Sequence, residues 1–124
     1  MGKLIAEEVG YDIIRGARGI IAAIAQHDSD LARQARRAAS SIVLNLGEGA
    51  RRVGRDRTHL WRVSAGSAAE LDRIVKVALA WGYIDDAAEL LALIDRELRL
   101  LWGLCRQSSS TASRARGRGA AKRP

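Results

Sequence analysis

The chain has 124 residues, of which 48% are apolar, and a formal net charge of +7. This length fits one domain, and the sequence contains neither a run of about 20 apolar residues nor a secretory signal, so we expect a cytoplasmic protein without membrane contact. The single cysteine, Cys105, excludes an internal disulfide.

Four helices are predicted, because the sequence has one proline and no alternating run of β-branched residues. The fold class is therefore all-α. The first helix covers residues 9–26 and the second covers residues 31–47, since apolar residues recur there every three or four positions. Asp28, Ser29 or Asp30 is expected to cap the second helix, and Gly47 with Gly49 is expected to end it.

The third and fourth helices are predicted at residues 57–81 and 86–106. Gly82 suits the left-handed position after the third helix, and Asp86 with Glu89 forms a D-x-x-E capping pattern for the fourth. Residues 107–124 are rich in Ser, Gly and Arg and lack apolar periodicity. We therefore expect a folded domain of residues 1–106 and a disordered basic tail of residues 107–124.

The fourth helix carries two apolar stripes, which is more than one face of a small bundle requires. At 100° per residue, the stripe that contains Ile94 and Leu101 is separated from a second stripe by roughly 120°. Two stripes indicate either deep burial or a subunit interface, and we favour an oligomer interface at Leu93, Leu100 and Leu104.

Positive charge is concentrated in two parts of the sequence. Residues 33–62 contain eight arginines and two acids, a local charge of +6, and residues 106–124 contain six cations and no acid. This asymmetry favours contact with a polyanion, although a neighbouring helix could neutralise the charge instead. Flexible guanidinium groups at loops and helix ends suit phosphate contacts. The predicted nucleic-acid-binding residues are Arg33, Arg36, Arg37, Arg51, Arg52, Arg55, Arg57, Arg62, Arg114, Arg116 and Arg118.

The sequence contains no catalytic or metal-binding motif. It has two histidines and lacks the H-E-x-x-H, P-loop, G-x-S-x-G and C-x-x-C patterns. We therefore predict a protein that is not an enzyme, with no catalytic residue, no metal and no cofactor. Glu97 falls within the apolar arc of the fourth helix, and we expect an arginine of a neighbouring helix or subunit to pair with it.

Polar residues stand in an apolar segment flanked by arginine pairs, RRAASSIVLNLGEGARR. An unpaired polar group in a core costs roughly 1–3 kcal/mol, so these residues need a specific role. The third helix also has polar residues at positions that are expected to face inward. A glycine among them would let the backbones of two helices approach closely. We interpret the set as a structural motif that sets helix register, ahead of direct ligand contact. Its members are Asn45, Glu48, Gly49, Gly66, Ser67 and Glu70.

The strings RRAASSIVLNLGEGARR (36–52) and SAGSAAELDRIVKVALAWGYID (64–85) resemble a known family. It comprises the small proteins encoded within intervening sequences of bacterial 23S rRNA genes and includes the accessory variability determinant of diversity-generating retroelements. The shared pattern is a basic pair, a serine-rich helix, N-hydrophobic-small-E-G, then G-S-x-x-E-L and G-Y-hydrophobic. The resemblance covers nearly all of residues 9–105. One departure is Val43, where family members commonly carry a proline.

The resemblance implies an antiparallel up-and-down four-helix bundle that assembles as a homopentameric ring. It also implies a positively charged surface that binds RNA or DNA and, in retroelement members, a reverse transcriptase as partner. We predict a non-enzymatic, oligomeric nucleic-acid-binding accessory protein that could act as an adaptor for such an enzyme. The alternative is a helical protein-interaction scaffold without direct nucleic-acid binding. Salt distinguishes the two, because phosphate contacts weaken steeply as salt rises.

Overall fold

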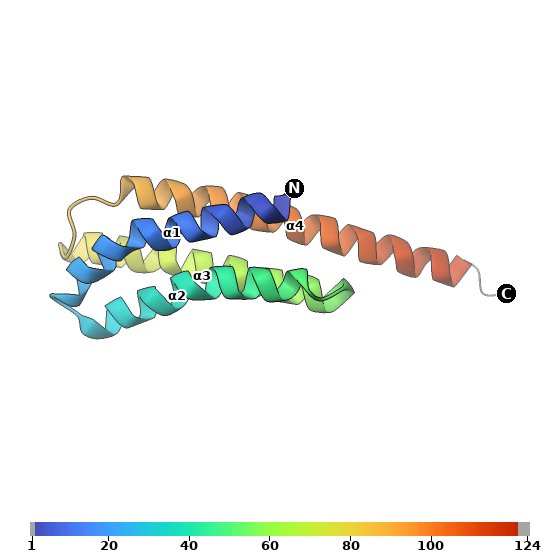
Figure 1. The fold of residues 1–124 in the computed structure, drawn as a ribbon, viewed down its shortest axis with the longest axis horizontal. Helices are drawn as coiled ribbons and strands as arrows, with labels where there is room; N and C mark the ends of the chain where they lie inside the picture. The colour runs from blue at the N-terminus through green and yellow to red at the C-terminus, as the bar shows by residue number, and fades with distance from the viewer. Residues whose placement is uncertain (1, 122–124) are drawn as a thin grey trace.

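The protein is a bundle of four helices, as the all-α prediction required. The computed structural model describes residues 2–121, with the side chains of residues 2, 3 and 5–109. Its helices are α1 (Gly2–Ala25), α2 (Ser29–Ala50), α3 (Gly54–Trp81) and α4 (Ala88–Ala121), and the described residues include no strand. Consecutive helices pack side by side, and α1 closes the bundle against α4. Figure 1 shows that successive helices run in opposite directions, so the fold is an antiparallel up-and-down bundle.

One apolar core runs through the bundle, and each helix supplies it with residues spaced three or four positions apart. Its largest fully buried apolar side chains are Ile13, Ile24, Ile42, Leu46, Leu71, Ile94, Leu101 and Val75. Within the part of the chain that the structure describes, no helix has the length and hydrophobicity needed to cross a membrane.

Two predicted helix signals are confirmed by hydrogen bonds. Asp28 caps α2, because its Oδ1 accepts a bond of 2.9 Å from the backbone N–H of Leu31. Gly82 follows α3 in the left-handed conformation, with a φ of 80°, and the N–H of Tyr83 donates back to the carbonyl of Ala78 at 2.9 Å.

The predicted stop of α2 at Gly47 and Gly49 is wrong, because the helix continues through both glycines to Ala50. Gly49 instead permits a close approach between helices. A Cβ at this position would lie 2.6 Å from Cδ1 of Trp61 on α3. The Trp61 indole is buried there, and its Nε1 donates a 3.0 Å hydrogen bond to the carbonyl of Leu46.

The predicted end of the fourth helix at Arg106 is also wrong, since α4 continues to Ala121. Residues 107–116 contain neither glycine nor proline, the strongest helix breakers, so nothing in their sequence ends the helix. Figure 1 shows this part of α4 projecting beyond the other helices. At its base, the hydroxyls of Thr58 and Ser108 are hydrogen-bonded at 2.7 Å. The rest of the predicted tail, residues 122–124, lies outside the described residues.

The two apolar stripes of α4 are accounted for within one chain. The helix packs against both α1 and α3, so each flank of its wide apolar face has a neighbour. Leu104 is only 7% exposed, and Leu93 and Leu100 are half-buried against the core. A single chain therefore already covers residues that we assigned to an oligomer interface, and the second stripe no longer argues for one.

Candidate nucleic-acid interface

The eight arginines of residues 33–62 do not form one patch. Arg33, Arg36 and Arg37 lie in the first half of α2, whereas the other five surround the loop between α2 and α3. Arg33 and Arg51 are 18 residues apart, which is about 27 Å along a helix. The length of α2 thus divides the predicted cluster into two groups.

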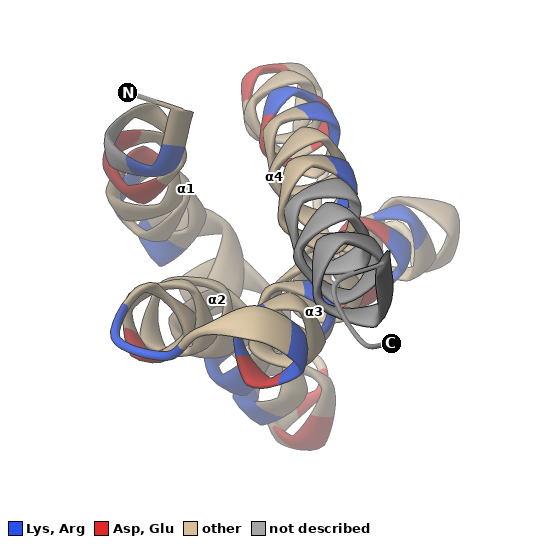
Figure 2. Cartoon of the chain, turned by 90° about the vertical axis from the view of Figure 1, so that its right-hand side faces the viewer, with Lys and Arg blue, Asp and Glu red and all other residues tan. Residues whose placement is uncertain are grey.

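The larger group is joined by Arg106 of α4, which is not among the residues predicted to bind nucleic acid. Burial raises the pKa of the Cys105 thiol, and the positive charges of Arg62 and Arg106 act in the opposite direction, so both lie near this thiol. We call Arg51, Arg52, Arg55, Arg57, Arg62 and Arg106 the basic end of the bundle. Figure 2 looks onto this end, with the loop between α2 and α3 toward the viewer.

Two arginines of the basic end have partners within the fold. Arg57 donates from Nε to the carbonyl of Gly49 at 3.3 Å and from Nη2 to that of Ala50 at 3.1 Å, and its guanidinium lies 5.4 Å from the Trp61 ring centroid. It therefore caps the C-terminus of α2, so it adds positive potential but is not a free phosphate ligand. Arg52 pairs with Glu48 at 2.9 Å, and both side chains are about half exposed. Such a surface pair is weak and can open to a ligand.

Trp102 is a further residue that the sequence did not single out for binding. It lies one turn before Cys105 on α4 and is 44% exposed. An exposed indole beside cations can stack on an unpaired base. In the sequence, Trp102 stands four residues before Arg106, so the two side chains lie on neighbouring turns of one helix face. This spacing is the feature from which Trp102 could have been predicted.

The polar motif is only partly internal. Asn45 is half-buried and donates from Nδ2 to Ser41 Oγ at 2.8 Å, and the buried Ser67 lies 2.7 Å from the same oxygen. This network joins α2 to α3 and agrees with a role in helix register. Glu48 and Glu70 are exposed, however, which corrects their predicted inward positions. Gly66 faces open space, so it does not bring two backbones together within one chain.

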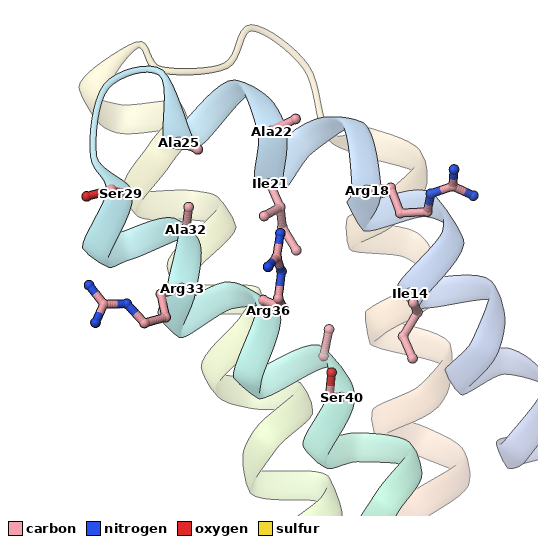
Figure 3. A pocket seen from close by; sticks show the side chains of 11 residues that line it. Ile14, Arg18, Ile21, Ala22, Ala25, Ser29, Ala32, Arg33, Arg36 and Ser40 are labelled. Atoms are coloured by element: carbon pink, nitrogen blue, oxygen red, sulfur yellow. The ribbon is translucent and has the colours of Figure 1, made fainter.

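Two arginines of the smaller group, Arg33 and Arg36, line a groove between α1 and α2, with a volume of about 520 Å³. Its floor is formed by isoleucine and alanine side chains, among them Ile14, Ile21 and Ala32. Figure 3 shows Arg36 pointing toward α1, whereas Arg18 and Arg33 point away from the groove. Arg33 also contacts Asp30 at 3.4 Å. The apolar floor offers few partners for the polar edges of a base, so we do not include it in the interface.

Glu97 is buried at 0% exposure, and no arginine of a neighbouring helix in the described part of the chain forms an ion pair with it. Neither carboxylate oxygen has a hydrogen-bond partner among the residues that the structure describes, and a Cβ on Gly10 would lie 3.0 Å from Oε2. Burial raises the pKa of Glu97 to about 8, and the charge of Arg96 opposes this only partly. No group of three or more potential metal ligands occurs among the described residues.

The predicted tail arginines, Arg114, Arg116 and Arg118, have side chains outside the described part of the structure.

A comparison with protein-family models matches residues 10–103 to the model described as 23S rRNA-intervening sequence protein. Comparisons with curated proteins and with solved structures found no match. The matched residues include all of α2 and α3 and parts of α1 and α4, and they contain both groups of arginines except Arg106.

Proposed function

This chain belongs to the family of 23S rRNA-intervening sequence proteins, and we propose that it binds RNA or DNA as a non-enzymatic accessory protein. The observation that carries the proposal is the basic end. It contains six arginines and two acids, Glu48 and Asp56, which gives a local net charge of +4. These residues lie on or next to the ends of packed helices. Among the described residues, Arg51, Arg55, Arg62 and Arg106 form no ion pair.

The chemistry of the basic end suits the sugar-phosphate backbone. Guanidinium groups bind phosphate oxygens through paired N–H donors, and such contacts position a nucleic acid without reading its sequence. The exposed face of Trp102 would add base stacking, which single strands offer more readily than duplexes. The basic end therefore favours single-stranded or unpaired regions.

Assembly would increase this affinity. The family resemblance implies a homopentamer, in which several basic ends would act on one nucleic acid. In a retroelement such a ring would serve as a cytoplasmic adaptor between a nucleic acid and a reverse transcriptase. The alternative function is a protein-interaction scaffold without nucleic-acid binding.

The test is fluorescence anisotropy with a labelled single-stranded RNA and a labelled DNA of unrelated sequence, titrated over a range of salt concentrations. Affinity should fall steeply with salt. The triple variant Arg51→Ala, Arg52→Ala, Arg55→Ala should weaken both complexes by a similar factor. It should also reduce the salt slope by about 2 for single strands, because each phosphate contact there contributes about 0.7 to the slope.

A matched control removes three arginines from elsewhere: Arg15→Ala, Arg96→Ala, Arg99→Ala. These side chains are exposed on α1 and α4, so their loss changes net charge equally without touching the basic end. Equal effects of the two triple variants would show that only net charge matters. Binding that is absent at low salt, or that does not depend on salt, would favour the scaffold.

A further inference from the structure

A small polar hollow opens between α2 and α3, away from the basic end. It has a volume of about 260 Å³ and is lined by Gln34, Arg37, Ala38, Ser41, Ser67 and Glu70. Four of these residues come from α2 and two from α3, so only the packing of the two helices creates it. Its size is slightly below that of sites for drug-sized molecules, which suits a ligand the size of a single base.

The floor of the hollow offers a hydrogen-bond donor. Ser41 Oγ accepts from Asn45 Nδ2 at 2.8 Å and from Ser67 Oγ at 2.7 Å. The Ser67 hydroxyl has one hydrogen and also lies 3.1 Å from the carbonyl of Val63, so it donates to either Ser41 or Val63. While it donates to Ser41, both lone pairs of the Ser41 oxygen are used, and the Ser41 hydrogen is left to donate to a ligand.

The rim of the hollow carries opposite charges that do not pair with each other. Arg37 and Glu70 line the same space, yet among the described residues neither takes part in an ion pair or a side-chain hydrogen bond. A ligand that fits this rim has a negative group for the guanidinium and at least one N–H donor for the carboxylate. A nucleotide has both.

We propose that this hollow binds an unpaired guanine base of a single-stranded nucleic acid, an inference that rests on the proposed function. Guanine presents two adjacent donors, N1–H and the N2 amino group, which match the two oxygens of the Glu70 carboxylate. Its neighbouring O6 accepts from the Ser41 hydroxyl, and the phosphate of the same nucleotide contacts Arg37.

The other bases fit this arrangement less well. Adenine and cytosine place a ring acceptor beside their amino group, so one carboxylate oxygen would face a lone pair. Uracil has a single N–H between two carbonyl oxygens, both of which a carboxylate repels. Each loses at least one of the two bonds to Glu70, and a bidentate contact is the kind that discriminates between bases.

The hollow is placed to act together with the basic end. Arg37 and Arg51 are 14 residues apart, so they lie on the same face of α2, separated by about 21 Å. A single strand held at the basic end can therefore follow this face of α2 and place one base in the hollow.

The test compares two labelled RNA probes of about 12 nucleotides, an oligouridylate and the same chain with one central guanosine. The natural chain should bind the guanosine probe about tenfold more tightly. Glu70→Gln should abolish this preference, so that both probes bind with the same affinity. It should also leave or slightly raise affinity for oligouridylate, because a negative charge near the phosphates is lost.

Glu48→Gln is the matched control, because Glu48 is an exposed acid of α2 that does not line the hollow. It should change both affinities alike and preserve the ratio. Equal binding of the two probes, or a guanosine preference that survives Glu70→Gln, overturns the guanine site but leaves nucleic-acid binding intact. Failure of both probes to bind at low salt overturns the proposed function and the guanine site together. Circular dichroism of each variant checks that the bundle is folded.

Discussion

At the scale of single residues, Gly47 and Gly49 lie two positions apart in α2 but have different surroundings. A Cβ on Gly49 would meet the Trp61 indole at 2.6 Å, whereas nothing lies within 4 Å of a Cβ on Gly47. We predict that Gly49→Ala lowers the free energy of unfolding by about 1–3 kcal/mol through overpacking. Gly47→Ala should raise it by roughly 0.5–1 kcal/mol through helix propensity. Urea denaturation followed by circular dichroism measures both, and changes of the same sign would contradict the packing of Trp61 on Gly49.

Glu97 predicts a pH dependence of stability. Its pKa is about 8 in the folded protein and 4.5 for the ordinary carboxyl. Between these values the folded state holds a proton that the unfolded state has released, so the free energy of unfolding falls as pH rises from 4.5 to about 8. Well above pH 8 the carboxyl of Glu97 is ionised in both states, so it no longer makes the free energy of unfolding depend on pH.

The measurement is the urea midpoint of the natural chain and of Glu97→Gln across this pH range. Glu97→Gln should remove most of the decline and stabilise the protein at pH 8 by several kcal/mol. Glu8→Gln, which removes an exposed carboxyl from α1, is the matched control. A decline that persists in Glu97→Gln would show that other groups cause it.

At the scale of helices, α4 joins the bundle to the basic segment that follows Arg106. Removal of residues 107–124 takes away five cations, and the described side chains among them, those of residues 107–109, do not belong to the buried core. The truncated chain should keep its helical spectrum and its affinity at low salt, with weaker binding at moderate salt and a flatter salt slope. The triple variant Arg114→Ala, Arg116→Ala, Arg118→Ala should show a smaller change in the same direction. Complete loss of binding on truncation would place the primary site in this segment instead of the basic end.

At the scale of the whole molecule, the resemblance to the family predicts a homo-oligomer. Light scattering at micromolar concentration should give a mass about five times the 13.4 kDa of one chain. The measurement is made after nuclease treatment and in high salt, so that bound nucleic acid does not link separate chains. Tyr11 and Trp81 are 45% and 71% exposed and are apolar residues that an interface could cover. A mass of one chain under these conditions would contradict the prediction.

The periodicity and the capping residues determined most of the fold. Apolar spacing located all four helices, and Asp28 and Gly82 marked helix ends as predicted, because a helix turn and its caps involve residues within about four positions of one another. The family could also be identified from the motif around Asn45 and Glu48. The positive net charge predicted binding to a polyanion, and this prediction needed no structure because net charge depends on composition alone.

The tertiary structure decided how the same residues are used. Gly49 became a contact surface for Trp61, Arg57 became a cap for α2, and Leu104 was buried by a neighbouring helix. The packing of α2 against α3 also placed Arg37 opposite Glu70. Sequence spacing gives the face of a residue on its own helix but not the residue it meets on the next one, because that depends on the register and rotation of the packed helices.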